Sequence, residues 1–274
     1  MAAGAILQSL LRPSDGRAQQ LDKEEASRPL LFEGRAPTVF CLHGFTGVPQ
    51  DVRLPCEVAR SLGLGAQAPL LPGHGTCPAD LSSLRFRDWV NGVRPQLSEA
   101  RKRGPVILVG HSLGALVATE LALEVPGDVL GLVLIASAFY LRRPHPDSSL
   151  AMAARLRLPD AFIPKSGPDL LDEEAKRTHV CYMEQPLHAA ISMREAGVRL
   201  RGELFRIHRP TLFLHGGGDQ VTPASGAEKA AACVGCADTR LIVYPRSHHI
   251  LTRDVDRERV AEDLRHFFQR LSST

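Results

Sequence analysis

The chain alternates short apolar runs with longer amphipathic segments over most of its length. Apolar runs rich in β-branched residues predict buried strands, at residues 38–42, 66–71, 106–109, 129–135, 211–214 and 241–244. Apolar positions at helical spacing predict helices, at residues 49–62, 88–103, 113–124, 224–232 and 255–271. Because strands alternate with helices, we predict an α/β fold with a mostly parallel central sheet flanked by helices.

The alternation fails between residues 139 and 205, where Pro and charged residues are frequent. Only helical fragments recur there, at residues 149–156, 170–183 and 187–201. We interpret residues 139–205 as a small helical cap, or lid, because they interrupt an otherwise complete α/β series. The core is then predicted to comprise residues 29–138 and 206–274. Residues 1–28 show little periodicity and predict a loose tail, with a short helix at 4–11.

Length and composition narrow the class of protein. A chain of 274 residues is long enough to bury a substantial core without disulfides. The net charge is only +3 and the Arg residues are dispersed, so we expect no nucleic-acid partner. The absence of a long apolar run and of a basic leader predicts no stable membrane insertion and a cytoplasmic location. The sequence leaves the oligomeric state open.

The six cysteines are scattered along the chain. Cys233 and Cys236 form a CxxC pair, but no second Cys or His pair stands at the spacing of a zinc site. We therefore expect free thiols, no metal and no cofactor.

Ser112 lies in the pattern GHSLG, at residues 110–114. A predicted buried strand leads into this pattern and a predicted helix leads out of it, which is the setting of a nucleophile elbow. Small residues at positions 110 and 114 leave room for a sharp turn that lifts the Ser112 hydroxyl to a helix N-terminus, where negative charge is favoured. The competing interpretation is that Ser112 only caps the helix.

A serine hydroxyl needs a base, and in this arrangement the order along the chain is Ser, acid, His. Asp219 follows the strand around residues 211–215, whereas the rival Asp238 precedes the next strand and would lie at the opposite end of the sheet. The base is expected in the loop before the last helix, where His248 and His249 are both available. The residues alone leave both open.

An oxyanion hole would complete the site. Its donors are predicted to be the backbone N–H groups of Leu113, which follows the nucleophile, and of Phe45, which follows an early strand. The competing interpretation of His43-Gly44 is a simple turn. The surrounding substrate pocket is predicted to include His43, Gly44, His74 and His111.

Several motifs together resemble the small bacterial carboxylesterases and monoacylglycerol lipases of the α/β-hydrolase superfamily. They are HGFTG at residues 43–47, LPGHGT at 71–76, DW at 88–89 and GHSLG at 110–114. The resemblance extends over residues 29–272. It implies a sheet of roughly eight strands, a helical cap and a Ser–Asp–His triad. Within the final motif it places His248 at the variable position and His249 at the position of the base.

The resemblance implies hydrolysis of short- to medium-chain acyl esters or monoacylglycerols through an acyl-enzyme on Ser112. Asp219, in the segment DQVTP at residues 219–223, matches the acid of the motif, and His249 would be the base. The same triad could instead act on a thioester, a C–C bond or a peptide bond. The cap departs from the lipases because it is rich in Arg and poor in large apolar residues.

Overall fold

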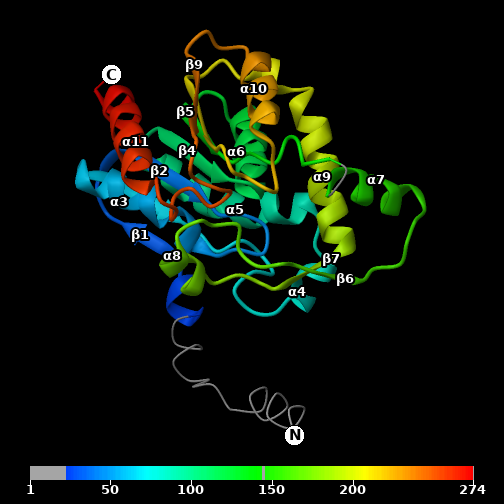
Figure 1. Ribbon diagram of the computed structural model, residues 1–274. Helices are drawn as coiled ribbons and strands as arrows, with labels where there is room; N and C mark the ends of the chain where they lie inside the picture. Colours follow the sequence, from blue (N-terminus) through cyan, green and yellow to red (C-terminus); the bar gives the residue numbers. More distant parts are fainter. Residues whose placement is uncertain (1–22, 144–145, 274) are drawn as a thin grey trace, which may run out of the picture.

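The computed structural model describes residues 23–143 and 146–273 (Figure 1). The short helix expected at residues 4–11 lies outside them. The described residues form a seven-stranded sheet in the order β1-β3-β2-β4-β5-β8-β9, and only β1 and β3 pair antiparallel. The strands are β1 (Leu30–Phe32), β2 (Arg35–Leu42), β3 (Leu64–Ala68), β4 (Val106–His111), β5 (Val129–Ile135), β8 (Thr211–Gly216) and β9 (Thr239–Tyr244). The predicted fold class is confirmed, although these residues form fewer strands than the resemblance implies.

Helices cover both faces of this sheet (Figure 1). The helices outside the cap are η1 (Pro49–Val52), α3 (Arg53–Ser61), α4 (Ala79–Ser82), α5 (Phe86–Lys102), α6 (Leu113–Glu124), α10 (Ala224–Cys233) and α11 (Arg257–Ser272). On one face, α3 and α11 share an apolar core with Val39 and Cys41 of β2; on the other, α5 and α6 share one with Phe40 and Leu42. Successive residues of a strand point to opposite faces, so burial on both sides explains the continuous apolar run of β2.

The agreement with the predicted elements is closest at the centre of the sheet. Strand β5 and helix α6 have the predicted bounds, and α6 ends before Pro126, which cannot continue a helix. The helix predicted over residues 49–62 divides instead into η1 and α3. Edge strand β1 was not predicted, because three residues carry no readable alternation.

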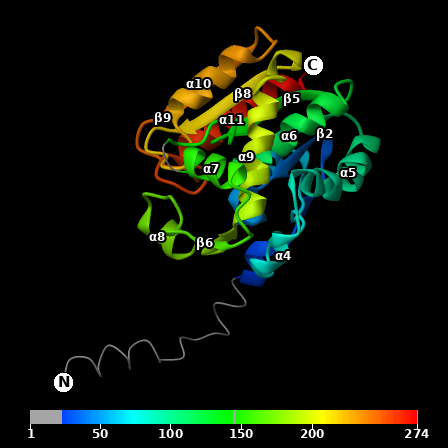
Figure 2. The same cartoon turned by 90° about the vertical axis from the view of Figure 1, so that its right-hand side faces the viewer.

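Residues 139–205, the segment predicted to be a cap and called the cap below, contain more strand and less helix than their sequence predicts. Its elements are α7 (Asp147–Arg155), β6 (Phe162–Pro164), α8 (Glu173–Arg177), β7 (Glu184–Pro186), α9 (Leu187–Arg201) and η2 (Leu204–Arg206). Strands β6 and β7 form a separate antiparallel pair. Helix α9 has the predicted bounds and packs alongside α6 (Figure 2), where Ala190 and Leu200 join the apolar core.

The helix predicted over residues 170–183 is only partly formed. It is limited to α8. Asp172 caps the N-terminus of this helix, because its Oδ1 accepts a hydrogen bond from the Ala175 N–H (3.0 Å). Residues after α8 turn inward instead, and the Tyr182 N–H donates to the carbonyl of Thr46 (3.0 Å). The prediction was wrong here because contacts with the core override local helix propensity.

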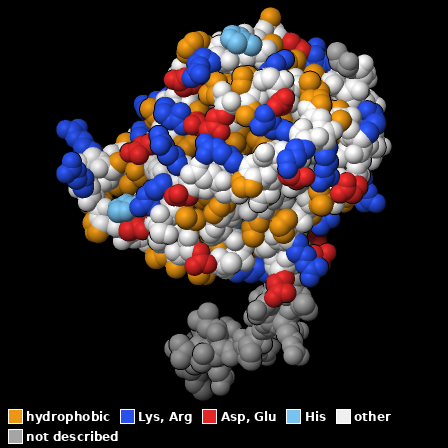
Figure 3. Space-filling model, turned by 180° about the vertical axis from the view of Figure 1, so that it is seen from behind, with side chains coloured by type: hydrophobic (Ala, Val, Ile, Leu, Met, Phe, Trp, Pro, Cys, Tyr) orange, Lys and Arg blue, Asp and Glu red, His pale blue; other side chains and the backbone are white. Residues whose placement is uncertain are grey.

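Within the segment predicted as a tail, residues 23–27 are helical, and Ala26 and Ser27 are buried. Lys23 Nζ donates to the carbonyl of Thr76 (2.6 Å). None of the helices in the described part of the chain is long and apolar enough to span a membrane. On the face drawn in Figure 3, basic side chains are interspersed with acidic ones.

Gly114 allows α6 to approach β2 more closely than any other residue would. A Cβ atom at this position would lie 2.0 Å from the carbonyl oxygen of Leu42, and backbone cannot move aside as a flexible side chain does. We expect Gly114→Ala to lower the free energy of unfolding by more than about 2 kcal/mol. Urea unfolding measures this. The control is Gly127→Ala, because a Cβ there would meet nothing within 4 Å; equal stability losses in both variants would contradict the packing argument.

Candidate active site

Ser112 stands at the sharp turn between β4 and α6. Its backbone has φ 53° and ψ −111°, a left-handed conformation that non-glycine residues rarely adopt. Three hydrogen bonds hold it there: its N–H donates to Ile135 O (2.9 Å), and its carbonyl accepts from the N–H groups of Ala115 (3.1 Å) and Ala138 (3.4 Å). The side chain makes no capping bond to α6, so helix capping does not explain a serine here.

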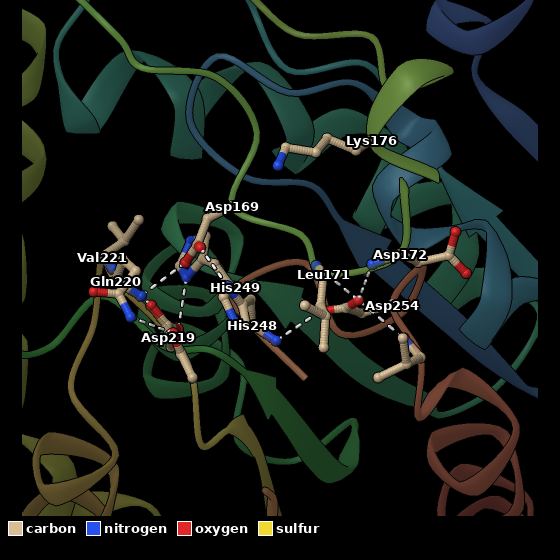
Figure 4. Close-up of polar contacts among 12 residues, drawn as sticks. Asp169, Leu171, Asp172, Lys176, Asp219, Gln220, Val221, His248, His249 and Asp254 are labelled. Atoms are coloured by element: carbon tan, nitrogen blue, oxygen red, sulfur yellow. Dashed lines mark hydrogen bonds and ion pairs between the residues drawn. The ribbon is translucent and has the colours of Figure 1, made fainter. Parts of the chain in front are cut away.

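Asp219 and His249 meet from two neighbouring loops (Figure 4). Asp219 follows β8, His249 follows β9, and Asp219 Oδ2 lies 2.8 Å from His249 Nδ1. An ionised carboxylate only accepts, so the Nδ1–H donates. Asp219 also accepts from the N–H groups of Val221 (2.8 Å) and Thr222 (2.7 Å) and from Thr222 Oγ1 (2.7 Å). The bond to Asp219 leaves the other ring nitrogen of His249 free for a second partner.

The two rival residues are directed elsewhere. Asp238 forms an ion pair with Arg270, and its carbonyl accepts from the N–H of Thr211, the first residue of β8, so it lies at the opposite end of the sheet from Asp219. His248 places its Nδ1 2.8 Å from Asp169 Oδ1 in the cap. Of the two adjacent histidines, His249 is therefore the one paired with Asp219.

Ser112 and His249 line the same cavity, which has a volume of about 70 Å³. The loop after β2 and the cap form its other walls. The lining residues are Gly44, Phe45, Thr46, Gly47, Asp51, His111, Ser112, Lys165, Gly167, Pro168, Asp169, His179, Cys181, Val221, His249 and Ile250. Leu113 opens α6, and N–H groups in a first helical turn have no partner within the helix. Both residues predicted to supply an oxyanion hole thus border the turn that carries Ser112.

The predicted pocket residues fall into two groups. Gly44 and His111 line the cavity. His43 and His74 are not among its lining residues: their rings pack edge to face, with centroids 4.9 Å apart. His43 Nε2 accepts from the Leu71 N–H (3.0 Å), and the His74 ring stacks on Tyr182. Their place in the substrate pocket stays a prediction; in this structure both rings contact the loop at residues 71–76, which also bonds Tyr182 of the cap.

A family model described as "Serine aminopeptidase, S33" matches residues 38–256. The chain belongs to this family. The chain is also similar to curated proteins: a thermostable monoacylglycerol lipase from Bacillus sp. (strain H-257) is 26% identical over 92% of this chain and 98% of the relative. A carboxylesterase from Bacillus subtilis (strain 168) is 25% identical over 89% and 97%, respectively.

A solved structure supports the same relationship. This structure, from work on LipS and LipT, two metagenome-derived lipolytic enzymes, superposes with a TM-score of 0.82 at 26% identity and covers 89% of this chain and 98% of the other. The resemblance to carboxylesterases and monoacylglycerol lipases is therefore confirmed for the chain as a whole.

Burial and charge set the protonation of the pair. Burial acts to raise the pKa of Asp219, but the adjacent His249, His215 and the Thr222 N–H outweigh it and hold that pKa well below its usual range. Burial acts to lower the pKa of His249, but the charge and hydrogen bond of Asp219 outweigh burial and raise it above its usual value. Asp219 therefore stays ionised and stabilises a protonated His249.

His111 remains neutral beside them. Burial, assisted by the neighbouring His249, lowers the pKa of His111 to about 3. Its Nε2 lies 3.1 Å from the carbonyl oxygen of His249, so the neutral ring donates there and supports the loop that carries His249.

The residues of the cavity wall that were not predicted from the sequence include Asp51, Lys165, His179 and Cys181. Lys165 Nζ donates to Thr46 Oγ1 (2.6 Å), and His179 Nδ1 lies 3.6 Å from Asp51 Oδ1. Burial raises the pKa of Asp51 to about 7. Apart from Asp51, which closely follows the HGFTG motif, these residues lie in the cap and carry no local signal. Within the described residues, no group of three or more His, Cys, Asp or Glu is placed to hold a metal.

The opposing effects on His249 can be separated by titration. We expect the NMR midpoint of His249 to lie above 6.5, its ordinary value. In Asp219→Asn the favourable charge is lost while burial remains, so the midpoint should fall below 6.5. His111 should stay neutral down to about pH 3 in the same spectra. A His249 midpoint unchanged by Asp219→Asn would show that the carboxylate does not control it.

Proposed function

We propose that this chain is a serine hydrolase that cleaves carboxylic esters through an acyl-enzyme on Ser112. The observation that carries the proposal is the 2.8 Å Asp219–His249 bond beside a cavity that His249 shares with Ser112. The relatives named as a carboxylesterase and a monoacylglycerol lipase support the same chemistry. All six cysteines are unpaired, which fits a reducing compartment, so we propose the cytoplasm as its location.

Each residue has a distinct task in the proposed reaction. His249 accepts the hydroxyl proton of Ser112 as the oxygen attacks the acyl carbonyl, and Asp219 stabilises the imidazolium that forms. The backbone N–H groups of Phe45 and Leu113 stabilise the oxyanion. His249 then protonates the departing alcohol. In the second half, His249 removes a proton from water, which cleaves the acyl-enzyme and regenerates Ser112.

The cavity wall favours small substrates over long-chain ones. Its volume is about 70 Å³, and Asp51, Lys165 and His179 make a polar end that would not desolvate favourably against an alkyl chain. Among short- to medium-chain esters and monoacylglycerols, we therefore propose short acyl groups as the preferred substrates. The second candidate is peptide-bond hydrolysis, which the family description "Serine aminopeptidase, S33" favours.

The nucleophile is tested by Ser112→Ala. Without the hydroxyl no acyl-enzyme forms, so hydrolysis of p-nitrophenyl acetate should fall by at least about 10⁴-fold, and covalent labelling by a fluorophosphonate probe should disappear. Ser225→Ala is the matched control, since Ser225 is exposed on α10, and it should keep both activities. Wild-type turnover by Ser112→Ala, or a probe adduct on another residue, would reject Ser112 as the nucleophile.

A substrate panel separates the two candidate reactions. We expect kcat/KM for p-nitrophenyl esters to fall by at least about 10-fold between the butyrate and the palmitate, because the longer chain does not fit a cavity of about 70 Å³. Aminoacyl p-nitroanilides should be hydrolysed poorly. Rapid cleavage of an anilide together with poor cleavage of every ester would support the peptidase instead. A preference for palmitate over butyrate would contradict the proposed preference for short acyl groups.

A further inference from the structure

One residue of the cap, Asp169, contacts both loops that carry the catalytic pair (Figure 4). Its Oδ2 accepts from the N–H of Gln220 (2.7 Å), the residue after Asp219. Its Oδ1 lies 2.8 Å from His248 Nδ1, and its backbone carbonyl accepts from the N–H of Ile250 (3.3 Å). Asp169 therefore bonds the residues on both sides of the base and the residue next to the acid.

Asp254 makes a second attachment between the same segments. This carboxylate is fully buried, and its Oδ1 accepts from the N–H groups of Leu171 (2.9 Å) and Asp172 (2.8 Å) in the cap. Its Oδ2 accepts from the N–H of His248 (2.7 Å). The cap chain around residues 169–172 is thus fastened to the loop of His249 at two points (Figure 4).

His248 connects the loop of the base to that of the acid. Its ring lies against Gly218, where an added Cβ would be 2.6 Å from His248 Nε2. Only glycine leaves space for the ring at that point. The side chain of His248 therefore fills the space between Gly218 and Asp169, and this contact joins the cap, the loop of Asp219 and the loop of His249.

We propose that Asp169 and His248 are positioning residues, which together fix the Asp219–His249 pair in register with the cap. This inference rests on the proposed function, because it assigns a role relative to that pair. Asp169 also lines the cavity beside Ser112. The interactions that place the cap over the substrate are then the same ones that place the base.

Asp169 also acts on His249 through its charge. After burial and the contributions of Asp219, the negative charge of Asp169 is a further cause that raises the pKa of His249, and the charge of Lys165 opposes it. The titratable and charged groups that face His249 from its surroundings are Asp51, His111, Lys165, Asp169, His215 and Asp219. Removing the charge at 169 should therefore favour neutral His249 at lower pH.

The test is Asp169→Asn in the full chain, with p-nitrophenyl acetate as substrate. Asn keeps the shape of Asp but loses the charge and replaces one acceptor oxygen with a donor, so one of the two side-chain bonds is lost. We expect kcat to fall by about 10- to 100-fold with a smaller change in KM, because a small displacement of the base is costly. The acid limb of kcat/KM should also move to lower pH, by about half a unit.

Variants of His248 separate geometry from charge. His248→Gln keeps a side-chain donor toward Asp169, and we expect kcat within a few-fold of wild type. His248→Ala removes the donor, so kcat should fall, while the acid limb stays in place because Asp169 keeps its charge. Glu184→Gln is the matched control, because Glu184 is an exposed carboxylate on β7 of the cap and lies outside the contacts between residues 169–172 and the loop of His249. It should behave as wild type.

The rate of fluorophosphonate labelling at Ser112 distinguishes a failure of this inference from a failure of the proposed function. If the wild-type chain is not labelled at Ser112, the proposed function fails. If the wild type is labelled, and Asp169→Asn is labelled at the same rate and with the same pH dependence, the positioning role is overturned. Should Asp169→Asn unfold, as judged by circular dichroism, His248→Ala decides, and a wild-type kcat in that variant overturns the inference.

Discussion

The strained backbone at Ser112 is the constraint on which the rest of the site depends. A left-handed serine persists only where its surroundings hold it in place, and here β5 and the chain at Ala138 do so through hydrogen bonds. The turn also forces backbone segments together. A Cβ on Gly110 would lie 2.2 Å from Gly114 O, and one on Gly44 would lie 3.4 Å from Ser112 Cβ. The same close packing that imposes the strain brings the loop of Phe45 beside the nucleophile.

The buried charge of Asp219 is compatible with folding because its oxygens are satisfied. An unpaired carboxylate at 1% exposure would be very costly, since removal from water penalises the charged form. Two backbone N–H groups, the Thr222 hydroxyl and the His249 ring supply the compensation. Asp51 offers a contrast: its Oδ1 has no hydrogen-bond partner within the described residues, and its pKa rises to about 7 as a result of burial. Similar burial is thus accompanied by pKa shifts in opposite directions, because the local donors differ.

The sequence could predict the parts of the molecule that are set by local pattern. Strand β5 and helix α6 match their predicted bounds, because elements buried on all sides consist of nearly continuous apolar residues that are easily recognised in the sequence. The choice of Asp219 as the acid followed from its position directly after a predicted strand. The choice of His249 over His248 needed the resemblance, because both histidines lie in the loop between the last strand and the last helix and the pattern of elements does not separate them. The geometry agrees, since it is His249 that contacts Asp219.

The remaining features depend on contacts between segments far apart in the chain. Lys165 reaches the cavity through Thr46, and Asp169 reaches both catalytic loops, yet neither lies in a readable motif. The shortened α8 has the same origin, since the chain after it follows the core instead of its own helix propensity. Patterns of hydrophobicity record which side of an element is buried, but not which loop a polar side chain will meet. In this fold the cap supplies most of those polar side chains. Substitutions in the cap can therefore alter the cavity wall without altering the sheet. Asp169 is an exception, because its substitution would also remove hydrogen bonds to the loops of Asp219 and His249.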